Sequence, residues 1–264
     1  MRKLYYFFLI AFGFIIASCS NKGKADAIAA KMVEAQIDGS YSEIREVERE
    51  LREWSRGLSS DESSEMEKYY KEAITENFMK AFDEELSDIA EKIKSRSYYS
   101  IDRSYEKFKK KVEKIDEEYR RLAYASLPLY LSQSFSKELE EYADAVLKAI
   151  KDGERYQVGR GDKKFVETCE RISDESNEVS NALKTAYRDV LKNKFEEYIK
   201  DNMKEYESLC KKGDKKEAEK WLRDYQKQVE KILSNASDEV KAAFGDVNRN
   251  IADDIMKQFE ESLE

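Results

Sequence analysis

The chain has 264 residues, a formal net charge of −8 and 39% charged side chains, and it contains no histidine. Without histidine, Ser-His-Asp and Cys-His catalysis, histidine metal sites and the usual general base of neutral pH are excluded. Three cysteines are too few for a thiolate zinc site once one of them is lipidated, as argued below. An acidic balance disfavours binding to a phosphate backbone. We therefore expect no cofactor, no metal ion and no nucleic-acid partner.

The N-terminus has the pattern of an export signal. Arg2 and Lys3 precede an apolar and small-residue stretch of 14 residues, positions 4–17. That stretch is shorter than the roughly 20 residues that a membrane-spanning helix needs. Its length is typical of the hydrophobic region of a secretory signal peptide.

The end of this stretch resembles the lipobox of bacterial lipoproteins, an aliphatic residue and two small residues before an obligatory cysteine: Ile16-Ala17-Ser18-Cys19. The resemblance covers residues 1–19 and implies that residues 1–18 are removed and that Cys19 carries acyl chains such as palmitate. Several chains are needed, since one holds a protein at a bilayer only marginally. The alternative is an ordinary signal peptide with a coincidental cysteine.

The resemblance also predicts where the protein resides. It implies a lipid-anchored protein of the cell envelope whose partner is the membrane, with residues 19–24 as a polar tether. Ser20, in place of aspartate, resembles lipoproteins sent to the outer membrane, which we favour over the outer leaflet of the cytoplasmic membrane.

The mature region has the spacing of helices. Apolar residues recur at alternating steps of three and four, and only one proline and nine glycines interrupt 264 residues. One stripe runs through residues 44–58, the longest through residues 101–122, and another through residues 165–190. Residues 25–264 are therefore predicted to be all-α, an elongated array or bundle of antiparallel helix pairs with coiled-coil-like seams.

Glycine and capping residues mark the predicted helix ends. We expect helices to end at Gly39, Gly57, Gly153 and Gly213. Ser40 with Glu43, and Asp214 with Glu217, have the spacing of N-terminal caps. Pro128 is expected to kink or interrupt its helix.

A degenerate repeat is the least obvious pattern. Three markers align without gaps: Ser60-Asp61-Glu62, Ser173-Asp174-Glu175 and Ser237-Asp238-Glu239. A phenylalanine follows each at the same distance, Phe82, Phe195 and Phe259, and a fourth copy begins near Asp116. The pattern predicts hairpin repeats at residues 40–96, 97–153, 161–213 and 214–264. Chance alignment of Glu-rich helices is the alternative.

The tripeptide Arg160-Gly161-Asp162 is the one candidate binding motif. It is read by some animal cell-surface receptors, and we expect it in the most loop-like segment, residues 153–161. The alternative is local, since Asp162 can cap a helix that starts at Lys163.

The remaining cysteines and aromatic residues allow two interpretations each. Cys169 and Cys210 lie on apolar stripes. They are interpreted as buried free thiols, with a disulfide between them as the alternative. The 17 tyrosines and 12 phenylalanines are interpreted as helix-contact residues, with a binding groove as the alternative.

No constellation of residues predicts catalysis. We expect a non-enzymatic scaffold or protein-binding lipoprotein with an unidentified protein partner. The alternatives are a surface-exposed adhesion or host-contact lipoprotein and, third, a hydrolase that uses carboxylates. Helices that pack only along narrow apolar seams leave no deep, dry cavity, so we expect none.

Overall fold

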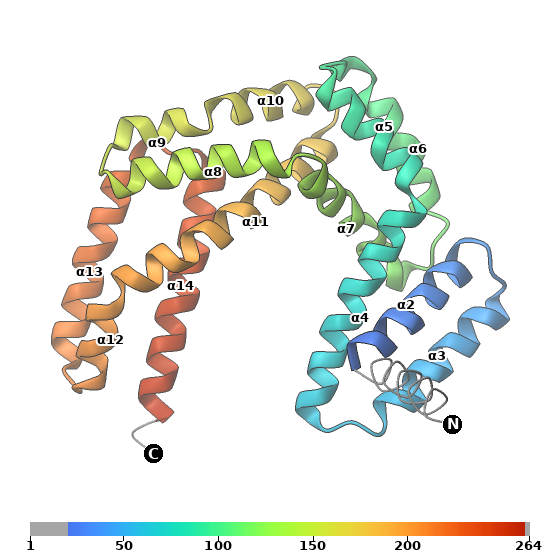
Figure 1. Cartoon of the computed structure of the whole chain (residues 1–264), viewed down its shortest axis with the longest axis horizontal. Coiled ribbons are helices and arrows are strands. Elements are labelled where there is room, and N and C mark those ends of the chain that lie inside the picture. The colour runs from blue at the N-terminus through green and yellow to red at the C-terminus, as the bar shows by residue number, and fades with distance from the viewer. Residues whose placement is uncertain (1–20, 262–264) are drawn as a thin grey trace, which may run out of the picture. The chain divides into compact units, whose positions relative to one another are not determined.

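The computed structural model describes residues 21–261, and within that range it contains thirteen α-helices, two 3-10 turns and no strand (Figure 1). The predicted all-α class is confirmed. The chain divides into two compact units at Tyr130 and Leu131, inside helix α7. The signal peptide and Cys19 lie outside the described residues.

The first unit is built from two sets of packed helices, α2–α4 and α5–α6. It contains α2 (Asn21–Ile37), α3 (Tyr41–Ser55), α4 (Ser60–Ala81), α5 (Asp83–Lys94), η1 (Tyr98–Ser100), α6 (Ile101–Val112) and the first part of α7 (Glu117–Ser134). Helix α2 packs on α3 and α4, and α5 packs on α6. Its largest fully buried side chains include Met32, Phe78, Phe82 and Phe108.

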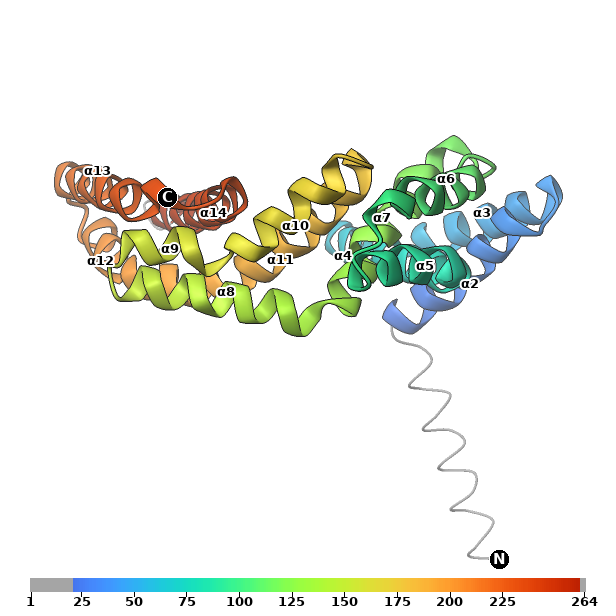
Figure 2. The ribbon, with the colours of Figure 1, turned by 90° about the horizontal axis from the view of Figure 1, so that it is seen from above.

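The second unit has α11 at its centre. It contains α8 (Ser136–Lys151), α9 (Arg155–Gly161), α10 (Lys163–Ser173), α11 (Asn177–Asn202), α12 (Lys204–Lys211), α13 (Lys215–Ile232), η2 (Leu233–Asn235) and α14 (Asp238–Glu261). Helix α11 packs against α8, α10 and α14, while α13 packs on α12 and η2. Helix α13 leads to η2 and α14 leads away from it, so the two helices run antiparallel (Figures 1 and 2).

The predicted helix ends are largely confirmed. The Glu43 carboxylate accepts hydrogen bonds from the backbone nitrogen and the hydroxyl of Ser40, as in a capping box. Gly153 and Gly213 follow α8 and α12 with φ angles of 69° and 75°, a left-handed conformation that favours glycine. The Asp214 side chain accepts from the backbone nitrogen of Glu217 and caps α13.

Four expectations about local structure are wrong, the one at Pro128 only for an interruption of the helix. Residues 21–24 are not a tether, because α2 already begins at Asn21. Residues 155–161 form helix α9 and not a loop. Pro128 does not interrupt its helix, because α7 continues past it to Ser134. The stripe over residues 101–122 is buried as predicted except at its end, but it spans two helices, with a break between Val112 and Glu117.

Of the three helix starts that the repeat predicts, two are found. Ser60 is the first residue of α4, and Ser237 caps α14, with its Oγ 3.3 Å from the backbone nitrogen of Val240. Ser173, by contrast, is the last residue of α10, and Ser176 caps the helix that follows. The third marker is therefore wrong. Phe82 and Phe195 are buried, while the side chain of Phe259 lies outside the described residues.

Candidate functional site

The tripeptide at residues 160–162 is held by packing contacts. A Cβ atom on Gly161 would lie 2.8 Å from Cγ2 of Val146, and one on Gly159 would lie 2.3 Å from the carbonyl oxygen of Asn235. Both glycines therefore let α9 approach its neighbours closely. Arg160 is exposed, but Asp162 is only 1% exposed.

The carboxylate of Asp162 has a partner inside the fold. It accepts a 2.6 Å hydrogen bond from the hydroxyl of Ser237. Burial raises the pKa of Asp162, and the nearby charge of Glu239 adds to that effect. A receptor that reads this tripeptide needs the carboxylate at the surface, so the expectation of an exposed motif is wrong.

Cys169 and Cys210 are buried free thiols on α10 and α12. Burial raises the pKa of Cys169 to about 12, which keeps it protonated and poorly nucleophilic. The Sγ of Cys210 lies 4.0 Å from Sδ of Met256. The structure therefore agrees with the interpretation of Cys169 and Cys210 as buried free thiols and not with a disulfide between them.

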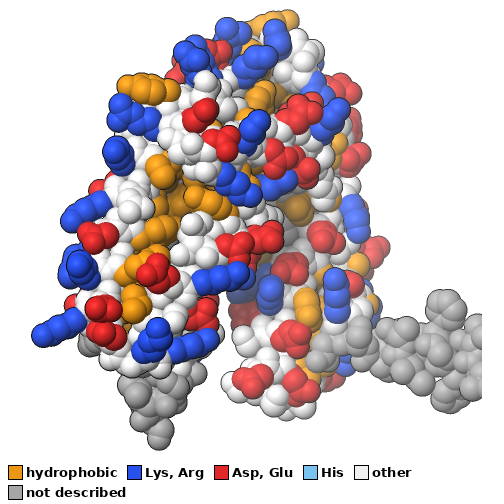
Figure 3. All heavy atoms as spheres, turned by 60° about the vertical axis from the view of Figure 1, so that its left-hand side comes forward, with side chains coloured by type: hydrophobic (Ala, Val, Ile, Leu, Met, Phe, Trp, Pro, Cys, Tyr) orange, Lys and Arg blue, Asp and Glu red, His pale blue; other side chains and the backbone are white. Residues whose placement is uncertain are grey.

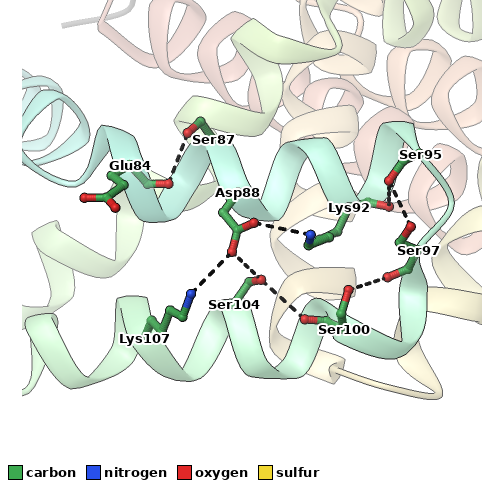
Figure 4. A network of polar contacts seen from close by, with 9 residues as sticks. All are labelled: Glu84, Ser87, Asp88, Lys92, Ser95, Ser97, Ser100, Ser104 and Lys107. Atoms are coloured by element: carbon green, nitrogen blue, oxygen red, sulfur yellow. Dashed lines mark hydrogen bonds and ion pairs between the residues drawn. The ribbon is translucent and has the colours of Figure 1, made fainter.

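In the first unit, a polar cluster joins α5 to α6. Figure 4 shows Asp88 between Lys92 of its own helix and Ser104 and Lys107 of α6. The buried Ser104 hydroxyl donates a 2.7 Å hydrogen bond to Asp88, and the two lysine nitrogens lie 3.6 and 3.9 Å from its carboxylate. Because every charged member has a partner, this cluster is a contact between helices.

A cavity of the first unit is rimmed by acidic side chains. It has a volume of about 390 Å³ between α2 and α3, and its residues include Glu34, Glu46 and Glu50, the last 2.8 Å from Lys31. No group of three or more Cys, Asp or Glu side chains in residues 21–261 is arranged to hold a metal ion.

The most distinctive surface lies in the second unit, along one face of α13. Two adjoining cavities of about 310 and 350 Å³ share Glu205, Trp221, Tyr225 and Gln228. The first extends over α12 and α13 to Leu209, Glu217, Lys220 and Asp224. The second extends toward α8, α11, η2 and α14: Ile150, Tyr198, Asn202, Val229, Ile232, Leu233 and Phe244. We call these residues the α13 groove.

The groove exists because α13 is only half covered. Ala218 is the one buried side chain among those described in α13. The larger apolar side chains on this helix, Trp221, Leu222, Tyr225, Val229 and Ile232, stay half-exposed. Figure 3 shows hydrophobic side chains gathered in a hollow of this face, with charged side chains around it. The apolar stripe of α13 therefore lacks part of its cover.

Aromatic rings stack at the centre of the groove. Trp221 and Tyr225 are one helical turn apart, with ring centroids separated by 5.0 Å and planes inclined by 13°. Tyr206 of α12 also stacks with Trp221, with ring centroids 5.9 Å apart. Such stacks present a large, rigid surface at small entropic cost.

The polar groups of the groove are only partly satisfied. The hydroxyl oxygen of Tyr225 is buried and has no hydrogen-bond partner among the described residues, and burial raises the pKa of Tyr225. A buried polar atom without a partner costs about 1–3 kcal/mol. The acidic rim includes Glu205 and Glu217, neither of which forms an ion pair with a described side chain. The groove thus offers an aromatic surface and negative charge.

Comparison of the chain with protein-family models, with curated proteins and with solved structures found no match. Among residues 21–261, no helix is both long enough and apolar enough to cross a bilayer.

The groove is not among the sites that the sequence pattern predicts. The spacing of Trp221 and Tyr225 by four residues places both on one face of a helix, and this signal is visible in the sequence. That the face is left uncovered depends on how α11, α12 and α14 pack, which the sequence pattern does not give.

Proposed function

We propose that this chain is a membrane-anchored envelope lipoprotein that acts as a non-enzymatic protein-binding module. Cys19 carries the lipid, and the α13 groove receives a protein partner. The observation that carries the proposal is the half-exposed Trp221–Tyr225 stack in an open groove. Interfaces concentrate their binding energy in such aromatic residues, surrounded by a polar rim.

The anchor would hold the first unit close to the bilayer. Helix α2 begins at Asn21, two positions after Cys19, and its residues Ile28 and Met32 are buried against the rest of the unit. A lipid on Cys19 is therefore followed almost at once by the folded unit. A short connection favours a partner within the cell envelope.

The second candidate, an adhesion protein, loses its specific support. It depended on the tripeptide at residues 160–162, whose Asp162 carboxylate is buried against Ser237. No other described feature favours adhesion over partner binding, so we propose only the latter.

Site-specific photo-crosslinking in intact bacteria tests this function. A photoreactive amino acid at Lys220, an exposed residue of the groove, is expected to capture one defined protein. The same substitution at Arg223, exposed on α13 outside the groove, is the matched control. Equal capture at both positions, or none at Lys220, contradicts the proposal.

A further inference from the structure

We infer that the α13 groove takes a cationic amphipathic helix, with an arginine or lysine side chain over the Trp221–Tyr225 stack and near Glu205 and Glu217. The inference rests on the proposed function and names the chemistry of the partner.

The dimensions of the groove suit a helix. Helix α13 has 18 residues, which corresponds to about 27 Å at 1.5 Å per residue. The groove follows it from Glu217 to Ile232. Amphipathic helices commonly bind by laying an apolar face in a groove of this kind.

The negative charge of the groove favours a positively charged partner. Glu205, Glu217 and Asp224 line it, and Lys220 is the one cation among the residues of its first cavity. Asp224 lies 3.6 Å from Lys227, but both are exposed, and such pairs contribute little. Glu205 and Glu217 thus remain available for a positive group. Complementary charge steers association and sets specificity.

The aromatic rings favour the same partner. Cations bind over the faces of tryptophan and tyrosine within about 6 Å of the ring centre. The unit already uses this contact, because Nζ of Lys151 lies 5.9 Å from the ring centre of Tyr198, another groove residue.

Two other occupants fit less well. A second copy of this chain would bring another net charge of −8 to an acidic rim. An acyl chain would remove water from Glu205, Asn202 and Gln228 without replacing their hydrogen bonds. A cationic helix offers both the apolar face and the charge.

Peptide binding followed by tryptophan fluorescence tests the inference. The chain has two tryptophans, so Trp54→Phe leaves Trp221 as the only one. This full-length protein, in phosphatidylcholine vesicles, is titrated with a helical peptide as long as α13 that carries leucines on one face and arginines beside them. The control peptide replaces each arginine with citrulline, a neutral group of the same shape.

The arginine peptide is expected to change the emission of Trp221 and to bind about tenfold more tightly than the citrulline peptide. Glu205→Gln with Glu217→Gln should remove that difference, and Glu230→Gln, exposed on α13 outside the groove, should keep it. If Trp54→Phe is unstable, calorimetry on the unsubstituted chain gives the same comparison.

Equal binding of the two peptides overturns the inference, as does a difference that survives the double substitution. If neither peptide binds while crosslinking at Lys220 captures a protein, the inference fails and the proposed function stands. If crosslinking at Lys220 also fails, both are wrong.

Discussion

The hydroxyl of Ser237 donates a 2.6 Å hydrogen bond to the carboxylate of Asp162, which ties the start of α10 to the start of α14. The same serine accepts from the backbone nitrogen of Val240 and so caps α14. One side chain thus terminates a helix and satisfies a buried acid. Asp162 therefore has a structural role that accounts for its burial.

This contact predicts an unusual dependence of stability on pH. Burial raises the pKa of Asp162 above its usual 3.8, so ionisation costs more in the folded than in the unfolded state. The stability that Asp162 contributes is therefore present below its unfolded pKa and is lost as pH rises through the folded pKa. Asp162→Asn keeps an oxygen acceptor for Ser237, so it should become more stable relative to the unsubstituted chain as pH rises above the unfolded pKa. Denaturant unfolding at a series of pH values measures the difference in unfolding free energy between the two proteins. A difference that does not change with pH would refute this role of Asp162.

The contribution of Asp88 to stability should depend on pH in the opposite direction. The hydrogen bond from Ser104 is the main reason that the pKa of Asp88 is lowered, with Lys92 and Lys107 adding to it. Its contribution is therefore present above the unfolded pKa and is lost as pH falls through the folded one. Asp88→Asn is expected to destabilise the chain by about 1 kcal/mol at neutral pH. The loss should shrink on acidification, in the same unfolding measurement. An effect that grows as pH falls would contradict the assignment.

The core of the first unit can be tested at the end of α6. Val112 is fully buried, and Lys110 two positions earlier is exposed. Val112→Asp places an unpaired carboxylate among apolar side chains and should cost about 2–4 kcal/mol. The matched substitution Lys110→Asp should change stability by less than about 0.5 kcal/mol. Thermal unfolding followed by circular dichroism distinguishes them, and equal melting temperatures would show that the seam is placed wrongly.

The sequence predicts helices well where the signal is local. Ser40 and Glu43 form their predicted cap because both groups belong to one turn of chain. The apolar spacing that predicted burial at Phe108 and Ile172 also held, since a helix must cover its apolar face.

The predictions fail where contacts between residues far apart in the sequence determine the local structure. Gly159 and Gly161 suggest a loop, yet they belong to α9. They are glycines because Asn235 and Val146 leave no room for a Cβ atom. The Ser173 marker has the composition of a helix start, but Ser176 provides the cap. Trp221 and Tyr225 belong to an apolar stripe like any other, and only packing leaves that stripe exposed.

Lipidation has its own test. Cys19→Ser should abolish both acylation and removal of the signal peptide, because the lipoprotein peptidase acts after the cysteine is diacylated. Mass spectrometry of the membrane and soluble fractions measures this. A soluble Cys19→Ser protein that has lost residues 1–18 would overturn the proposed anchor.

The central claim is that the α13 groove binds a protein partner, and quantitative co-purification from solubilised membranes tests it most directly. The unsubstituted chain is compared with Trp221→Ala and with Tyr156→Ala, which removes an aromatic ring that is 67% exposed and lies outside the groove. Removing a central aromatic residue of an interface typically costs at least about 2 kcal/mol of binding, roughly a thirtyfold loss of affinity. We expect a partner that is recovered with the unsubstituted chain and with Tyr156→Ala and is strongly depleted with Trp221→Ala, all three folding alike by circular dichroism. Equal recovery with all three proteins would contradict the account.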